Sequence, residues 1–92
     1  MNKGELVSAV AEKAGLSKGE ATRAIESTFE VITRALSQGD EVKVVGFGSF
    51  LIAERAAGEA RNPRTGEKVS VAAAKMPKFR AGAQLRSAVN SQ

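Results

Sequence analysis

Hydrophobic and polar residues follow a helical period in the first third of the 92-residue chain. Apolar residues between Leu6 and Ala14 recur three and four positions apart, and Gly15 ends the pattern. Asn2 followed by Glu5 has the spacing of a capping box, in which a side chain at the start of a helix bonds to free backbone N–H groups. These features predict a short helix between Asn2 and Gly15.

A second capping box, Ser17 with Glu20, predicts a longer helix over about 18–37 that ends at Gly39. One face of this helix is apolar over a width that one small neighbouring helix cannot cover. It consists of Ala21, Ala24, Ile25, Thr28, Phe29, Val31, Ile32, Ala35 and Leu36. The helix is either an ordinary core helix or one shared between the core and a dimer interface. We favour a helix shared between the core and a dimer interface, because few other elements of the chain are available to bury its apolar face.

From Asp40 the period changes to the alternation of a strand, with Val42 and Val44 separated by Lys43. Gly46-Phe47-Gly48 then leads into a second apolar stretch, which predicts a hairpin with glycines at its turn. A nucleotide-binding G-x-G-x-x-G loop is not expected, because Leu51 occupies the third glycine position and no strand-to-helix crossover follows. Tight turning and close packing are the expected roles of the glycines.

The sixteen residues from Ala53 to Lys68 contain no Val, Ile, Leu, Phe or Met. Connections of this length are usually functional or disordered. Pro63 lies near the centre, where a turn is its natural place. Val69, Val71 and Ala73 then alternate as a returning strand that we expect Pro77 to end, and a short helix is expected over about 82–90. The fold class is therefore α+β, with a long β-ribbon arm.

The charge of +4 is concentrated in the second half of the chain. Residues 1–45 contain six Lys and Arg against seven Asp and Glu, whereas residues 46–92 contain eight against three. This asymmetry favours a polyanionic partner, either nucleic acid or an acidic membrane face. The sequence contains no Cys and no His, which removes disulfides and the commonest metal ligand, and no apolar run approaches the roughly 18 residues that span a bilayer. We expect a soluble intracellular protein without cofactors.

Seven cations lie along and after the arm, interrupted only by Glu59 and Glu67. They are Arg55, Arg61, Arg64, Lys68, Lys75, Lys78 and Arg80. A charge run is commonly a solvated face, but the absence of apolar residues favours a ribbon that follows a nucleic-acid groove. Pro63 either shapes the turn only or wedges between base pairs. The helix after Arg80 has no capping side chain, so its N–H groups, with Lys78 and Arg80, are candidate phosphate contacts, as is Lys3 at the first helix.

Five segments together resemble the bacterial histone-like HU proteins, within the family of HU and integration host factor. They are Asn2-Lys3-Gly4-Glu5-Leu6-Val7, Gly15-Leu16-Ser17-Lys18, Gly46-Phe47-Gly48-Ser49-Phe50, Arg61-Asn62-Pro63-Arg64-Thr65-Gly66-Glu67 and Pro77-Lys78-Phe79-Arg80. The resemblance covers nearly the whole chain. It implies a single domain in which residues 1–39 form a helical dimerisation part and residues 40–92 form a three-stranded antiparallel sheet, the arm and the last helix.

The resemblance also implies an intertwined dimer whose two arms enter the minor groove of double-stranded DNA, where a proline at each tip kinks the duplex. Little base specificity is implied. The implied DNA contacts are Lys3, Arg55, Arg61, Asn62, Pro63, Arg64, Lys68, Lys75, Lys78, Arg80 and Arg86. Val42, Val44, Phe47, Phe50 and Phe79 would fill the core. The implied function is bending and compaction of DNA in the bacterial nucleoid, within the cytoplasm.

This chain departs from many HU relatives at several positions. Ala53 and Gly58 stand where relatives carry further basic residues on the arm, Ala60 stands in place of a glycine, and Ala83 often in place of a lysine. Fewer phosphate contacts predict weaker binding and a shallow dependence on salt.

Several alternatives remain open at the level of sequence. A sequence-specific subunit resembling integration host factor is disfavoured by Val45, where one chain type of that factor has an arginine. A small nuclease is disfavoured because no acid–base or metal-binding constellation is present. An interaction module that grips an acidic protein is the third alternative. Binding to RNA, preference for nicked, bent or junction DNA, and pairing with itself or a related chain are not decided.

Overall fold

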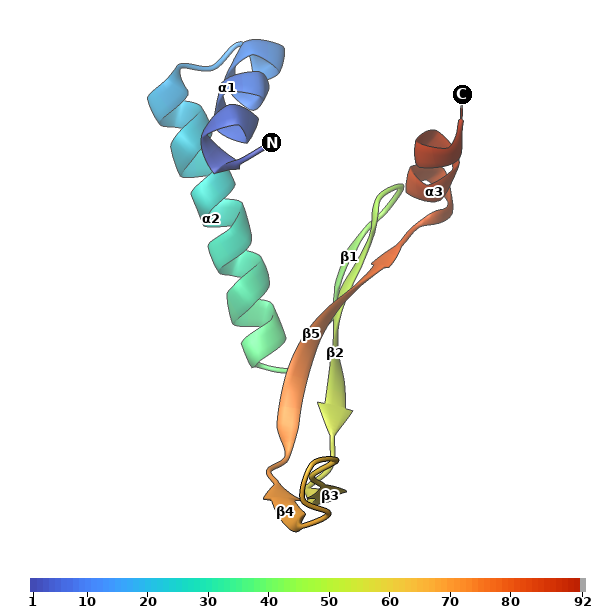
Figure 1. The fold of residues 1–92 in the computed structure, drawn as a ribbon. Coiled ribbons are helices and arrows are strands. Elements are labelled where there is room, and N and C mark those ends of the chain that lie inside the picture. The colour runs from blue at the N-terminus through green and yellow to red at the C-terminus, as the bar shows by residue number, and fades with distance from the viewer. Residues whose placement is uncertain (92) are drawn as a thin grey trace. The chain divides into compact units, whose positions relative to one another are not determined.

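The computed structural model describes residues 1–91 as three helices and five strands in the order α1, α2, β1, β2, β3, β4, β5, α3 (Figure 1). The chain forms two compact units, Met1–Ala35 and Leu36–Gln92.

The helix α1 (Lys3–Ala14) begins and ends where the sequence predicts. The side-chain Oδ1 of Asn2 accepts a hydrogen bond of 2.8 Å from the backbone N–H of Glu5. At the other end Gly15 adopts φ 69°, in the left-handed region that glycine favours, and its N–H bonds to the carbonyl of Ala11. Both ends of α1 are therefore fixed by local side-chain and backbone bonds.

The helix α2 (Lys18–Ser37) starts with a complete capping box. The Ser17 N–H donates to Glu20 Oε1 at 2.9 Å, and the Glu20 N–H donates to Ser17 Oγ at 3.1 Å. The bonds that Glu20 accepts from Ser17 lower the pKa of its carboxyl group. The predicted stop is also confirmed, because Gly39, two residues after the end of the helix, has φ 86° and its N–H bonds to the carbonyl of Leu36.

Few residues are buried within a single chain. Among residues 1–91 only Val7, Ala21 and Ile25 form a buried hydrophobic core, with Leu6, Val10 and Ala11 packed beside them. The apolar face of α2 continues well beyond this core. Phe29 keeps 51% of its surface exposed and Val31 keeps 65%.

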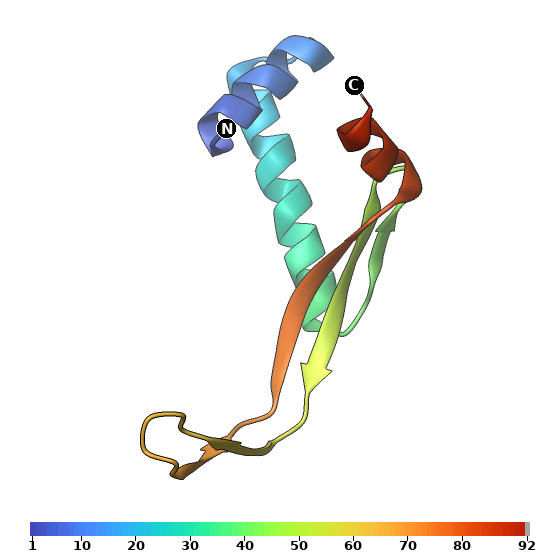
Figure 2. The ribbon, with the colours of Figure 1, turned by 45° about the vertical axis from the view of Figure 1, so that its right-hand side comes forward.

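The second unit contains a three-stranded antiparallel sheet in the order β1–β2–β5. Its strands are β1 (Val42–Val44), β2 (Gly48–Arg55) and β5 (Ala74–Ala81). The predicted hairpin is confirmed, since β1 and β2 pair directly and the Phe47 N–H closes the turn on the carbonyl of Val44 at 2.9 Å. Figure 2 shows β2 and β5 running side by side from α3 (Ala83–Asn90) toward the arm.

Close packing against backbone requires a glycine at position 48, and a positive φ favours one at position 46. A β-carbon on Gly48 would lie 2.5 Å from the carbonyl oxygen of Arg80, and one on Gly46 would lie 2.6 Å from Oε1 of Gln84. Gly46 also has φ 85°. The hairpin turn thus packs closely against the end of β5 and the first turn of α3.

The prediction that Pro77 ends the returning strand is wrong. Pro77 lies inside β5, opposite Ile52 of β2. The strand continues because β5 is at the edge of the sheet, and an edge strand tolerates a residue that has no backbone N–H. The alternating residues Val69 and Val71 belong instead to a separate strand of the arm.

The arm is a second, two-stranded antiparallel ladder formed by β3 (Gly58–Arg61) and β4 (Lys68–Val71). Arg55 opposes Ala74 at the end of the first ladder, and Gly58 opposes Val71 at the start of the second. Two alanines on each strand, Ala56-Ala57 and Ala72-Ala73, are left outside both ladders. We call these four residues the alanine joint. The register is the same on both sides of the joint.

The five residues that the resemblance assigns to the core gather on one face of the sheet and its turn. The rings of Phe47 and Phe79 lie 5.4 Å apart between centroids, and those of Phe50 and Phe79 lie 5.0 Å apart. Within one chain this cluster stays open, because Val44, Phe47 and Phe79 each keep more than 40% of their surface exposed.

Candidate nucleic-acid interface

The tip of the arm is a turn held by its own polar groups. The Asn62 N–H donates to the Glu67 carbonyl at 2.8 Å, and the Gly66 N–H donates to the Asn62 carbonyl at 2.7 Å. The Asn62 Oδ1 accepts a third bond, of 2.9 Å, from the Arg64 N–H, which spans Pro63. Pro63 is consequently fixed at the end of the ribbon with its ring exposed to solvent.

One face of the arm carries charge and the other is apolar. Arg61 lies directly opposite Lys68, so the two side chains share a face, whereas Ala60 and Val69 share the other. Like charges directly opposite each other are destabilising, and here the nearest acid is Glu59, whose carboxylate lies 4.0 Å from the Lys68 amine. A bound phosphate would relieve this repulsion.

Of the cations at the base of the arm, Arg55 has a hydrogen-bond partner within the chain. The guanidinium of Arg55 donates to the carbonyl of Ala72 at 3.1 Å across the alanine joint. Lys75 lies opposite Glu54 in the sheet register. By contrast, within residues 1–91 no hydrogen bond or ion pair engages the guanidinium groups of Arg61 and Arg64. The guanidinium groups of Arg61 and Arg64 at the tip are therefore freer to meet a ligand than that of Arg55 at the base.

The sheet separates its charges from its apolar residues by strand alternation. Residues opposite one another project to the same face, as do alternate residues along a strand. Val42, Phe50 and Phe79 oppose one another on one face, which is apolar except for Glu54 and Lys75. Arg80 and Lys78, opposite Ser49 and Leu51, lie on the other face, which carries no acidic residue in the three strands.

Lys43 is a cation of this polar face that the sequence reasoning missed. It lies opposite Ser49, whose other neighbour across the sheet is Arg80. The alternation of Val42, Lys43 and Val44 already placed Lys43 on the face opposite the valines. The signal was overlooked because Lys43 stands apart from the run of cations along the arm.

The start of α3 is open, as predicted. Gly82 precedes the helix in an extended conformation, and no side chain caps the first turn. Arg86 lies one turn into α3 and is exposed. The strand β5 carries Lys78 and Arg80, and α3 carries Arg86. In Figure 2, α3 lies at the end of the second unit that is remote from the arm.

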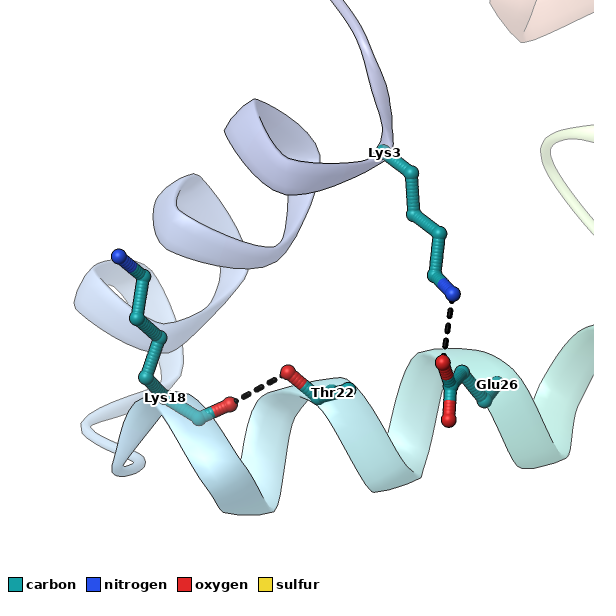
Figure 3. Close-up of polar contacts among 4 residues, drawn as sticks. All are labelled: Lys3, Lys18, Thr22 and Glu26. Atoms are coloured by element: carbon teal, nitrogen blue, oxygen red, sulfur yellow. Dashed lines mark hydrogen bonds and ion pairs between the residues drawn. The ribbon is translucent and has the colours of Figure 1, made fainter.

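Lys3 belongs to the helical unit and has an acidic partner there. Its amine forms an ion pair with Glu26 of α2, as Figure 3 shows. Lys18 begins α2, eight residues before Glu26, and its carbonyl accepts a hydrogen bond of 2.8 Å from the Thr22 hydroxyl. Both members of the Lys3–Glu26 pair are largely exposed, so an anion that reaches Lys3 competes with one carboxylate in water.

Within the described part of the chain, no group of three or more His, Cys, Asp and Glu side chains is arranged to hold a metal ion. None of the helices over residues 1–91 has the length and apolar character that crossing a bilayer requires.

The sequence pattern of the family described as Bacterial DNA-binding protein matches residues 1–90. The chain belongs to this family. It is 52% identical over 89 residues to DNA-binding protein HU of Geobacillus stearothermophilus, which covers 97% of this chain and 99% of that protein. DNA-binding protein HU-beta of Neisseria meningitidis is also 52% identical over 89 residues, covering 97% of this chain and 100% of its own.

Solved structures of family members share the fold. The Anabaena HU–DNA cocrystal structure matches with a TM-score of 0.88 and 49% identity, and the match covers 100% of both chains. HU from Thermotoga maritima matches with a TM-score of 0.69 and 33% identity, over 98% of this chain and 100% of that chain. These similarities confirm the α+β fold with its β-ribbon arm.

Proposed function

We propose that this chain is an architectural DNA-binding protein that bends and compacts duplex DNA with little base specificity. The observation that carries the proposal is the end-to-end match to the HU chain that was crystallised with DNA. The acid-free polar face of the sheet and the solvent-exposed arginines of the arm tip support the same function, because phosphate contacts supply most of non-specific DNA affinity.

The contacts divide into two groups according to their place in the second unit. The arm group contains Arg55, Arg61, Asn62, Pro63, Arg64, Lys68 and Lys75. The flanking group contains Lys78, Arg80 and Arg86, to which Lys3 of the helical unit is added. In the arm group, Asn62 uses its Oδ1 within the turn, which leaves its amide nitrogen for a ligand.

Pro63 acts as a wedge in this proposal. Its apolar ring is exposed at the end of a ribbon in whose turn Asn62 makes three hydrogen bonds. Insertion between base pairs costs a few kcal/mol per unstacked step, and the bend that results brings more phosphates to the protein. Bent, nicked and junction DNA are then favoured substrates, because part of that cost has already been met.

We infer that the working form is a dimer of one domain per chain, in which residues 1–39 provide most of the pairing surface. The support is the small size of the buried core and the exposure of Phe29, Val31 and Phe79. A chain of this length hides only a modest share of its surface, and a second subunit would cover these side chains. Catalysis has no part in the proposal, and the expected location is the bacterial nucleoid.

The test is a gel-shift comparison of intact, nicked and four-way-junction duplexes over a salt series, with wild type and Pro63→Ala. We expect preference for the distorted DNA, and loss of most of that preference in Pro63→Ala. Equal binding of all three DNAs by both proteins would exclude the wedge. Because Ala53, Gly58 and Glu59 reduce the charge of the arm, we expect a shallow salt slope, and a slope near −10 would contradict this expectation.

An RNA duplex and an acidic protein serve as competitors in the same assay. Competition by unlabelled DNA but not by the acidic protein is the expected result. Tight binding of a protein partner that persists with saturating DNA would favour an interaction module instead.

A further inference from the structure

The polar face of the sheet contains a row of three hydrogen-bonding side chains, one from each strand. Lys43 of β1 lies opposite Ser49 of β2, and Ser49 lies opposite Arg80 of β5. Neighbouring strands are about 4.8 Å apart, so the two cations start roughly 10 Å apart with the serine hydroxyl between them. Long side chains on either side of a short hydroxyl form a cradle for one tetrahedral anion.

This row has no acidic partner in the sheet. Neither the amine of Lys43 nor the guanidinium of Arg80 takes part in a hydrogen bond or ion pair with any of residues 1–91. Lys78 adds a further positive charge on the same face, two residues along β5. Glu54 of β2 projects to the opposite, apolar face, where it lies opposite Lys75 of β5.

We propose that Lys43 and Arg80 together bind one backbone phosphate of DNA above Ser49, which makes Lys43 a DNA contact of this chain. The Arg80 guanidinium presents a planar fork to the phosphate oxygens, the Lys43 amine supplies a mobile charge, and the Ser49 hydroxyl is positioned to donate. This inference rests on the proposed DNA-binding function and extends it to a residue outside the arm and α3.

The position of the row determines which DNA reaches it. Ser49 and Asn62 are thirteen residues apart along β2, the alanine joint and β3, which is roughly 43 Å of extended chain at about 3.3 Å per residue. That length corresponds to roughly 13 base pairs of duplex at about 3.4 Å per base pair. The phosphate bound by the row is therefore distinct from those at the arm tip, and the duplex used in the test must extend well beyond the tip.

The experiment measures affinity for a duplex of about 40 base pairs over a salt series, using wild type, Lys43→Gln and Lys43→Arg. Loss of one phosphate contact should reduce the magnitude of the salt slope by about 0.9 per chain and weaken binding several-fold at low salt. Lys43→Arg keeps the charge and should retain the slope. Because Lys43 is exposed, unchanged circular dichroism and thermal midpoint should accompany each substitution.

Lys13→Gln is the matched control, since it removes the same charge from an exposed position on α1 that belongs to no proposed contact. A salt slope that is equal in Lys43→Gln and Lys13→Gln, while Pro63→Ala still impairs binding, would overturn the role of Lys43 and leave the proposed function intact. Failure of wild type to bind the duplex would overturn the proposed function itself.

Discussion

Gly48 lies directly against Phe79: a β-carbon on Gly48 would come within 2.6 Å of the phenyl ring. The same β-carbon would meet the backbone oxygen of Arg80 at 2.5 Å, which cannot move aside as a flexible side chain would. The contact joins the hairpin turn to β5 at the place where the three phenylalanine rings meet.

Gly48→Ala should therefore destabilise the fold. Overpacking of this kind typically costs about 1–3 kcal/mol, to be measured as the change in free energy of unfolding in urea. Gly58→Ala is the control, because no atom lies within 4 Å of a β-carbon at that position. If both variants unfold at the same urea concentration, the close approach has no energetic consequence.

Replacement of Asn62 by alanine should impair DNA binding without removing charge. The Arg64 N–H loses its acceptor, so the turn that fixes Pro63 loosens. We expect weaker binding of nicked DNA with an unchanged salt slope, and little change in thermal midpoint because the tip is exposed. Asn62→Ser should restore part of the affinity, since a serine hydroxyl makes the same kind of turn bond more weakly. An alanine variant that binds as wild type does would contradict this account.

Removal of the carboxylate that pairs with Lys3 should strengthen DNA binding. In Glu26→Gln the Lys3 amine no longer has a charged partner in its own chain, so it is freer to meet phosphate. Stability should change by less than about 1 kcal/mol, because the ion pair is exposed. Glu30→Gln makes the same change in net charge on the same helix. An equal gain in affinity in both variants would mean that net charge, rather than the release of Lys3, is responsible.

The capping box of α2 should make stability depend on pH in the acidic range. The pKa of Glu20 is lowered from its ordinary value of 4.5 by the bonds with Ser17, so the unfolded chain binds a proton at this site more readily than the folded chain does. The contribution is complete above pH 4.5 and is lost as pH falls through the lower pKa of the folded state. Glu20→Gln keeps an acceptor for Ser17, so its thermal midpoint should fall less than that of wild type between pH 5 and pH 3. Parallel curves for the two proteins would rule out this linkage.

The exposed apolar residues predict that stability depends on protein concentration. If folding is coupled to dimerisation, the thermal midpoint should rise when the concentration is increased about a hundredfold, because mass action favours the paired state. Sedimentation at the same concentrations gives the mass directly. A concentration-independent midpoint together with the mass of one chain would exclude an obligate dimer.

The limits of α1 and α2 were predictable from the sequence because they are set locally. Asn2, Ser17 and Gly15 act through bonds to backbone groups three or four positions away, so the signal is complete in a short stretch of sequence. The glycines of the hairpin were predicted for the same reason. Their partners at Arg80 and Gln84 were not, because a close approach between distant segments leaves no local pattern.

The strands after the arm were harder to predict because position in a sheet decides what a residue can do. A proline such as Pro77 normally argues against a strand, but an edge strand such as β5 tolerates one. Whether a strand lies at the edge or in the centre depends on the whole sheet, so the local sequence does not reveal it. The polar face illustrates the same limit. Lys43 and Arg80 are far apart in sequence, and only the register of three strands makes them neighbours of Ser49.

The alanine joint constrains how the arm can vary. Equal numbers of residues, Ala56-Ala57 and Ala72-Ala73, interrupt the two strands, so the register is kept between the sheet and the arm. One residue inserted on a single side would turn the arm residues of that strand to the opposite face, moving Arg61 away from Lys68. Length changes at this place are therefore tolerable only as matched pairs, and a family survey of this segment should find insertions and deletions on both strands or on neither.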